Sequence, residues 1–161
     1  MARPLRSRHF TNRPEDQVTR LNQCGTADAY HIEAGQSGVH VAAIQAALLA
    51  FQARANAVRA LAPLLKLQPP MPRISSTEID SRTYGDTTRA AVKAYKKAFD
   101  IRRSGQADPD DIVGIMTIDR MDEHMVAIEG QGGSARIVTR VKRRDLVGVR
   151  TKVVGSSGGV R

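Results

Sequence analysis

Apolar residues recur at helical spacing along the first half of the chain. After Ser37 they appear at every third or fourth position, namely at Val41, Ile44, Leu48, Phe51, Ala55 and Val58. This spacing places the side chains on one face of an α-helix. The Ser37 hydroxyl can cap such a helix, and Pro63 cannot continue its hydrogen-bond ladder. We therefore predict a long helix from Ser37 to about Ala62.

Two shorter stretches repeat the same arrangement of a glycine-containing turn, a polar cap and an apolar face. The second stretch follows Tyr84-Gly85, with Asp86 or Thr87 as its cap and Ala91, Val92, Tyr95 and Phe99 on its inner face. The third follows Gly114 and places Ile118, Met121 and Met125 at helical spacing. Three helices joined by turns predict a mainly α fold, a three-helix bundle whose first helix is extended.

The two ends of the chain have a different pattern. Residues 1–13 are arginine-rich and aperiodic, so we expect them to be extended, and Asn12 followed by Pro14 indicates the start of a short helix. From Ser134 onward, β-branched residues alternate with Arg and Lys. This alternation predicts a C-terminal β-hairpin followed by a flexible tail. An isolated hairpin is marginal in water, so we expect it to pair with the domain or with a partner.

The charge supports a division into three parts. The net charge of the chain is +9. Residues 1–20 carry five Arg against two acids, and residues 130–161 carry eight basic side chains against one acid. We therefore predict a basic N-terminal arm with a short helix (1–33), a domain (34–129) with a proline-rich insertion (63–79), and a basic C-terminal segment (130–161).

The sequence offers few groups for catalysis. The single cysteine, Cys24, excludes an internal disulfide. The four histidines are scattered, and Asp110-Asp111 is typical of a turn, with an acid/base pair as the alternative. We expect no enzymatic activity, no metal and no cofactor. No apolar run of ~20 residues is present, so we expect no membrane span. No signal peptide is present either. We therefore expect synthesis in the cytoplasm and a role at the cell envelope or in a phage-like particle.

Three motifs occur in a familiar order. They are Gly35-x-x-Gly38-x-x-Val41-x-x-Ile44-Gln45-x-x-Leu48, then Asp80 to Tyr84-Gly85-x-x-Thr88-x-x-Ala91-Val92-x-x-Tyr95, then Asp111-Ile112-Val113-Gly114-x-x-Thr117 followed by Met121. Together they resemble the peptidoglycan-binding domain family found beside bacterial wall hydrolases. The chain departs from that family in having Tyr95-Lys96 in place of Phe-Gln, a longer turn before Tyr84 and an expanded link after the first helix.

The resemblance implies a three-helix, non-enzymatic module that binds peptidoglycan. The turns before the second and third helices would border a shallow polar groove. Four residues there are the predicted ligand-binding site: Arg82 for carboxylates, Tyr84 for packing on sugar or peptide, and Asp80 and Asp111 for amide donors.

Two other functions remain open. The first is a structural or adaptor subunit of a phage tail or contractile injection assembly. In that case the basic C-terminal segment would dock on a partner protein through Arg136, Arg140, Lys142, Arg143, Arg144 and Arg150. The second is nucleic-acid binding through the basic arms. Charge alone favours it, and no stacking aromatic residues lie between the basic residues.

Overall fold

The computed structural model describes residues 4–145, with side chains described as far as residue 131. The elements along the chain are α1 (Arg8–Thr11), α2 (Glu15–Cys24), η1 (Asp28–Tyr30), α3 (Val39–Arg54), η2 (Arg59–Lys66), α4 (Ser76–Ser81), α5 (Asp86–Ala98) and α6 (Ile115–Asp145), where η denotes a 3-10 helix. The prediction of a mainly helical bundle is confirmed. Within residues 4–145 the only β-type pairings are isolated bridges between Ile32 and Val113 and between Ser37 and Thr83.

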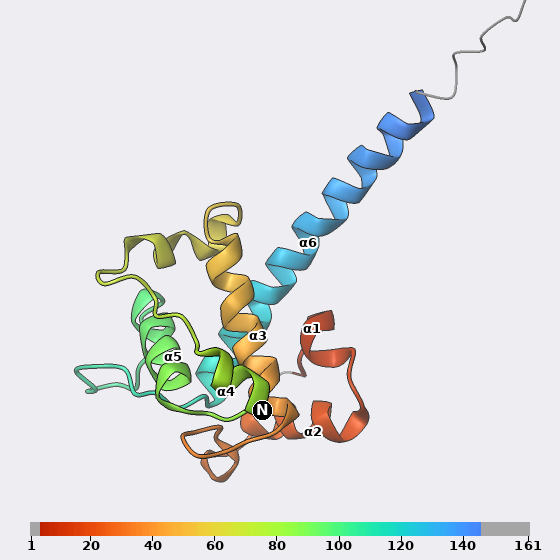
Figure 1. Ribbon diagram of the computed structural model, residues 1–161. Coiled ribbons are helices and arrows are strands. Elements are labelled where there is room, and N and C mark those ends of the chain that lie inside the picture. The colour runs from red at the N-terminus through yellow and green to blue at the C-terminus, as the bar shows by residue number, and fades with distance from the viewer. Residues whose placement is uncertain (1–3, 146–161) are drawn as a thin grey trace, which may run out of the picture.

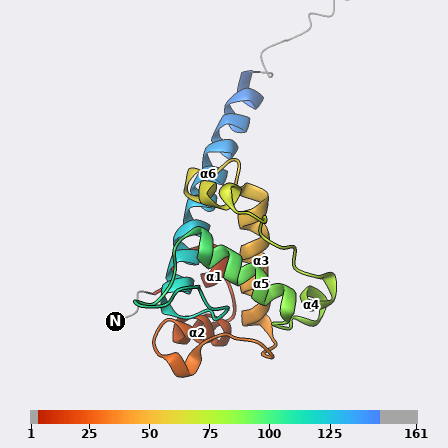
Figure 2. The ribbon, with the colours of Figure 1, turned by 90° about the vertical axis from the view of Figure 1, so that its left-hand side faces the viewer.

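Helix α3 is the centre of the fold, in contact with α1, α2, α5, α6 and η2. Both ribbon views show the other helices arranged around it (Figures 1 and 2). Its apolar side chains have no exposed surface on the predicted face, at Val41, Ile44, Leu48 and Phe51, and Ala43 and Ala47 outside that face are also fully buried. A helix whose side chains are buried on several sides must be covered by neighbours, which explains why the short helices pack around α3.

The predicted length of this central helix was wrong. Helix α3 ends at Arg54, and the chain bends by 88° into η2, which contains Pro63. Val58 has an extended backbone, and its side chain is buried together with Leu61 and Leu64 of η2. The apolar periodicity continues through the bend because these side chains reach the core by folding back over it.

The predicted C-terminal β-hairpin was also wrong. Ile137, Val138 and Val141, which were expected in strands, belong to α6, which runs to Asp145. The buried residues Ile118 and Met121 anchor the first turns of α6. Once a helix is nucleated, each further residue adds a hydrogen bond at little cost, so the β-branched residues extend it. The part of the predicted hairpin in residues 146–161 lies outside the described residues.

Helix α6 is the longest element and extends well beyond the rest of the protein (Figure 1). At about 1.5 Å per residue, its 31 residues span roughly 46 Å. Among the described residues no single helix is both long and apolar enough to cross a bilayer. Helices α3 and η2 reach that length and composition only as a bent pair.

The N-terminal segment, expected to be extended, packs on α6. Phe10 of α1 is fully buried. The backbone N–H groups of Arg6 and Ser7 donate to the buried Asp122 carboxylate at 3.0 and 2.8 Å. Glu129 accepts from two further N–H groups at the start of α1. Carboxylates on α6 therefore hold the N-terminal segment through its backbone N–H groups, and Nε of Arg6 adds a longer contact of 3.6 Å to Asp122.

Candidate functional site

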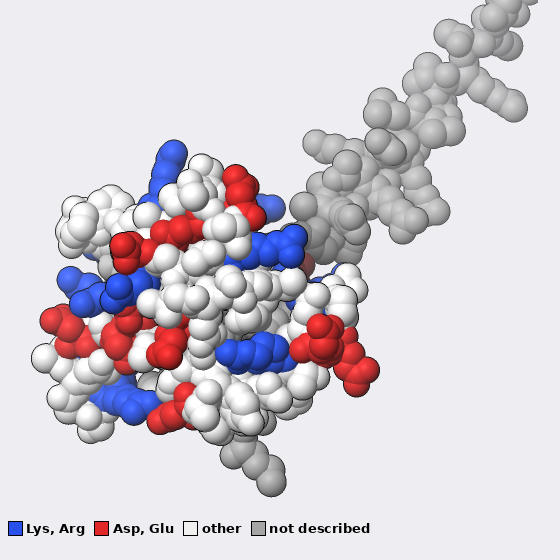
Figure 3. Space-filling model, turned by 60° about the horizontal axis from the view of Figure 1, so that its bottom comes forward, with Lys and Arg blue, Asp and Glu red and all other residues white. Residues whose placement is uncertain are grey.

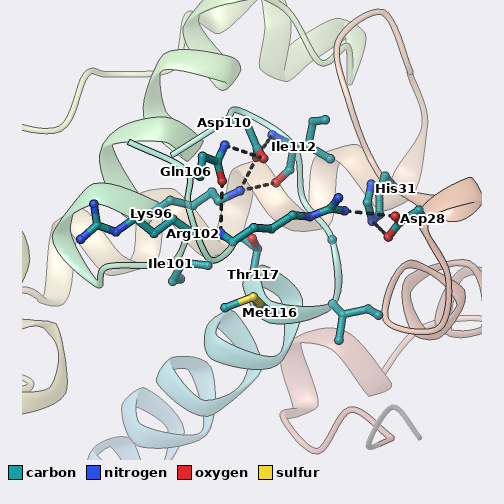
Figure 4. A pocket seen from close by; sticks show the side chains of 13 residues that line it. Asp28, His31, Lys96, Ile101, Arg102, Gln106, Asp110, Ile112, Met116 and Thr117 are labelled. Atoms are coloured by element: carbon teal, nitrogen blue, oxygen red, sulfur yellow. Dashed lines mark hydrogen bonds and ion pairs between the residues drawn. The ribbon is translucent and has the colours of Figure 1, made fainter. Parts of the chain in front are cut away.

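A cavity of about 550 Å³ lies where three parts of the fold meet. They are the turn around η1, the last turn of α5 with the loop that follows it, and the first turn of α6 (Figure 4). The lining residues are Asp28, His31, Lys96, Ile101, Arg102, Arg103, Gln106, Asp110, Ile112, Gly114, Ile115, Met116 and Thr117. Cavities of roughly 300–1,000 Å³ are typical of small-ligand sites.

Backbone pairing holds two walls of the cavity together. Ile32, just after η1, and Val113, just before α6, exchange both N–H···O bonds, at 3.0 and 2.9 Å. The buried Cys24 thiol also donates to the Val113 carbonyl at 2.9 Å, and burial raises the pKa of Cys24 to about 12. The cysteine therefore supports the cavity wall as a neutral thiol.

Gly114 is needed for the close approach of these walls. A Cβ atom at this position would lie 2.7 Å from Nε2 of His31, which is closer than real Cβ contacts. The absence of a side chain lets the His31 ring lie against the start of α6. His31 in turn contacts Oδ1 of Asp28 through Nε2 at 3.1 Å.

The most buried charged side chain in the lining is that of Lys96, which is only 7% exposed. It forms an ion pair with Oδ1 of Asp110 and donates to the Ile112 carbonyl at 3.1 Å. Gln106 Nε2 and the Ile112 N–H also donate to Asp110. Burial by itself would raise the pKa of Asp110, but these hydrogen bonds outweigh it and hold that pKa below its usual value.

A second ion pair lies at the outer part of the cavity. Nη2 of Arg103, in the loop before α6, lies 3.1 Å from Oδ2 of Asp28 in η1. The two side chains are 66% and 70% exposed. Ion pairs this exposed contribute about 0–1 kcal/mol, so this pair is weak compared with Lys96 and Asp110.

Apolar residues complete the cavity. Ile101 is buried, whereas Ile115 and Met116 are 36% and 54% exposed. Exposed methionines are common on surfaces that bind ligands because the side chain is flexible and polarizable. The arrangement thus offers charges of both signs beside an apolar surface, which suits the binding of a polar ligand that also has aliphatic parts.

The structure separates the predicted ligand-binding residues from this cavity, since none of the four lines it. Tyr84 is fully buried, and its hydroxyl donates to the Asp111 carbonyl. Burial raises the pKa of the Tyr84 phenol above its usual range. The Asp111 carboxylate lies 2.5 Å from Nε of Arg89. Tyr84 and Asp111 therefore have structural roles. The hydrogen bond of Tyr84 to Asp111 and the ion pair of Asp111 with Arg89 hold the loop before α6 against α5.

The other two predicted residues lie at the end of α4. Asp80 and Arg82 are both exposed. Arg82 has a left-handed backbone (φ 53°) that ends α4, and its carbonyl accepts from the Gly38 N–H at 3.0 Å. Their side chains are free to meet solvent, but they do not converge on the cavity.

The acid/base alternative for Asp110-Asp111 is not supported by the geometry. Asp110 pairs with Lys96, whereas Asp111 pairs with Arg89. The two carboxylates are therefore directed to different cations. Within the described part of the chain, no group of three or more His, Cys, Asp and Glu side chains is arranged to hold a metal.

The residues proposed for partner docking lie toward the end of the chain. Arg136, Arg140, Lys142, Arg143 and Arg144 belong to α6, and Arg150 lies outside the described residues. These five residues lie in a helix instead of the predicted hairpin. Arg136, Arg140 and Arg144 recur every four residues, close to the period of an α-helix. On the face of the body shown in Figure 3, Lys and Arg side chains are interspersed with Asp and Glu.

Sequence reasoning missed Asp28, Lys96 and Arg103 as cavity residues. Lys96 had a usable signal, because a lysine follows Tyr95 where the peptidoglycan-binding family has glutamine. Asp28 and Arg103 had none, since 75 residues separate them in the chain. Comparisons with known protein families, curated proteins and solved structures found no match.

Proposed function

We propose that this chain is a non-enzymatic module that binds peptidoglycan, and that the cavity beside the start of α6 is its binding site. The cavity supports this function because it combines charges of both signs with an apolar rim. It also lies at the motif that resembles the third motif of the peptidoglycan-binding family, since Ile112, Gly114 and Thr117 line it.

The lining matches the chemistry of the cell wall. Peptidoglycan stem peptides present carboxylates, amides and short aliphatic side chains, and its sugars carry acetamido groups. Arg103 can bind a carboxylate when its exposed pair with Asp28 opens, and Gln106 can bind an amide. The neighbouring Arg102 is paired with Asp100 at 2.7 Å. Met116 and Ile115 offer an exposed apolar surface for aliphatic groups. A cavity of about 550 Å³ has room for a small part of such a peptide rather than for a long polymer.

The state of the carboxylates favours binding over catalysis. The two acids in the lining, Asp28 and Asp110, are each paired with a cation, Arg103 and Lys96 respectively. Hydrogen bonds keep the pKa of Asp110 low, so this carboxylate is a weak base at neutral pH.

Co-sedimentation with purified sacculi tests this function. Met116→Arg places a bulky cation at a rim position that is 54% exposed, so the fold should tolerate it. Leu65→Arg is the matched control, because Leu65 is 53% exposed and lies in η2, outside the lining. The unmodified chain and Leu65→Arg should pellet with sacculi, whereas Met116→Arg should remain in the supernatant. Failure of the unmodified chain to pellet at low and moderate salt would refute the function.

A second candidate function is an adaptor in a phage-tail-like or injection assembly. The length of α6 favours it, because this helix extends beyond the body (Figure 1). The sequence of its last turns also contains Arg136, Arg140 and Arg144. Deleting residues 134–161 separates the two functions. Wall binding through the cavity should survive this deletion, whereas incorporation into a host particle should be lost if α6 docks on a partner.

A further inference from the structure

Two ion pairs line the cavity, and they are held very differently. Lys96 is buried, and its partner Asp110 accepts hydrogen bonds from three donors. Arg103 has one contact with Asp28, at 3.1 Å, and both side chains are mostly exposed. The inner pair is therefore part of the wall, while the outer pair can open at little cost in free energy.

The outer pair joins two separate segments across the cavity. Asp28 belongs to η1, and Arg103 belongs to the loop between α5 and α6. The contact of His31 Nε2 with Oδ1 of Asp28 helps to hold the carboxylate in place when the arginine leaves. Opening the pair would leave one carboxylate and one guanidinium at the cavity, both within reach of a ligand.

We propose that Arg103 and Asp28 exchange their mutual ion pair for an amino-acid end group that carries both a free ammonium and a free carboxylate. This proposal rests on the proposed function and names the part of the wall that the cavity recognises. Asp28 accepts hydrogen bonds from the ammonium, and the guanidinium of Arg103 binds the carboxylate through two parallel N–H groups. Met116 packs on the aliphatic part of the same residue.

Charge complementarity favours this zwitterionic group over simpler ligands. A purely anionic ligand on Arg103 would leave Asp28 without its cation and beside a like charge. A purely cationic ligand on Asp28 would leave Arg103 in the corresponding position. A neutral sugar carries no charge, so it could not replace the ion-pair partner that either side chain loses when the pair opens. Only a ligand with both charges restores an ion-pair partner to each side chain.

The test uses muropeptides that a muramidase releases from sacculi. One sample is left intact, a second has its free amines acetylated, and a third has its carboxylates amidated. Each is titrated into the full chain and followed by calorimetry. The intact muropeptides should bind roughly three- to fivefold more tightly than either blocked sample, as expected for loss of one contact to a side chain as exposed as Asp28 or Arg103.

Two variants test which side chain binds which end of the ligand. Asp28→Asn should bind intact and acetylated muropeptides equally, because the ammonium no longer has its carboxylate. Arg103→Ala should bind intact and amidated muropeptides equally. The matched controls are Glu123→Gln and Arg59→Ala, which change exposed charged residues outside the lining and should keep both preferences. Circular dichroism should show that all four variants fold.

The outcomes separate this proposal from the proposed function. Equal binding of intact, acetylated and amidated muropeptides would overturn the zwitterion proposal and leave wall binding standing. Persistence of both preferences in Asp28→Asn and Arg103→Ala would also overturn it, because the recognition would then belong to other residues. No binding of intact muropeptides together with no pelleting of the chain with sacculi would refute both.

Discussion

Replacement of Lys96 by methionine tests whether the inner ion pair stabilises the cavity wall. Methionine retains most of the aliphatic volume, so packing changes little and the main loss is the cation. Asp110 would then keep its charge in a half-buried position without its closest partner. The Ile112 carbonyl would also lose a donor.

The size of the effect follows from the exposure of the two side chains. Breaking a fully buried pair costs about 3–5 kcal/mol, whereas a fully exposed pair contributes about 0–1 kcal/mol. Here the lysine is 7% exposed and the aspartate 33% exposed, so solvent can reach the carboxylate. We therefore expect Lys96→Met to lower the free energy of unfolding by about 2 kcal/mol at pH 7.

The pKa of Asp110 also predicts how the effect of Lys96→Met changes with pH. The pKa of Asp110 is lowered in the folded protein relative to an aspartate in the unfolded chain, whose pKa is about 4. The Asp110 carboxylate therefore stabilises the fold above about pH 4, and this stabilisation is lost as the pH falls through the lower pKa of the folded state. The difference in unfolding free energy between the unmodified chain and Lys96→Met should therefore become smaller below about pH 4.

Urea denaturation followed by circular dichroism at pH 7 and at pH 3 measures both effects. Lys93→Met is the matched control, because Lys93 lies in the same helix and is exposed, so its loss should change stability by less than about 0.5 kcal/mol. A loss at Lys96 no larger than at Lys93 would refute the assignment of the inner pair as a stabilising contact. A difference that stays constant down to pH 3 would refute the role of the Asp110 charge.

Two further changes test other parts of the structure. Burial lowers the pKa of His124 to about 4, so the folded protein resists its protonation and loses stability as the pH falls from about 6.5 toward 4. His124→Gln should flatten this part of the curve of unfolding free energy against pH, and an unchanged slope would contradict the assignment. Gly114→Ala should displace the His31 ring, detected as a change in its proton resonances, with a loss of stability of about 1 kcal/mol or less because the ring can move. An unshifted His31 ring would show that the two walls are not in close contact.

The candidate site was less accessible to sequence reasoning than the fold. The motifs drew attention to Tyr84 and Asp111, because residues of these types at turns are common in binding sites. In the structure Tyr84 is buried and Asp111 is paired with Arg89, so both stabilise the loop before α6. The cavity is lined by Asp28 and Arg103, and no local pattern links residues so far apart in the chain.

The sequence by itself determined the helical class and the places where α3, α5 and α6 begin. Apolar periodicity and turn glycines act within a few turns of helix, so they can be recognised locally. The predicted capping residues Ser37, Asp86 and Thr87 were wrong, because the N-cap residues of α3 and α5 are Gly38 and Gly85, which make no side-chain cap hydrogen bond. Tertiary structure decided where α3 ends, because Val58 and the side chains of η2 reach the core by bending back. It also decided that α6 continues through a β-branched stretch, since a helix anchored in the core propagates cheaply. The cavity, too, is a tertiary feature, because the pairing of Ile32 with Val113 brings its distant walls together.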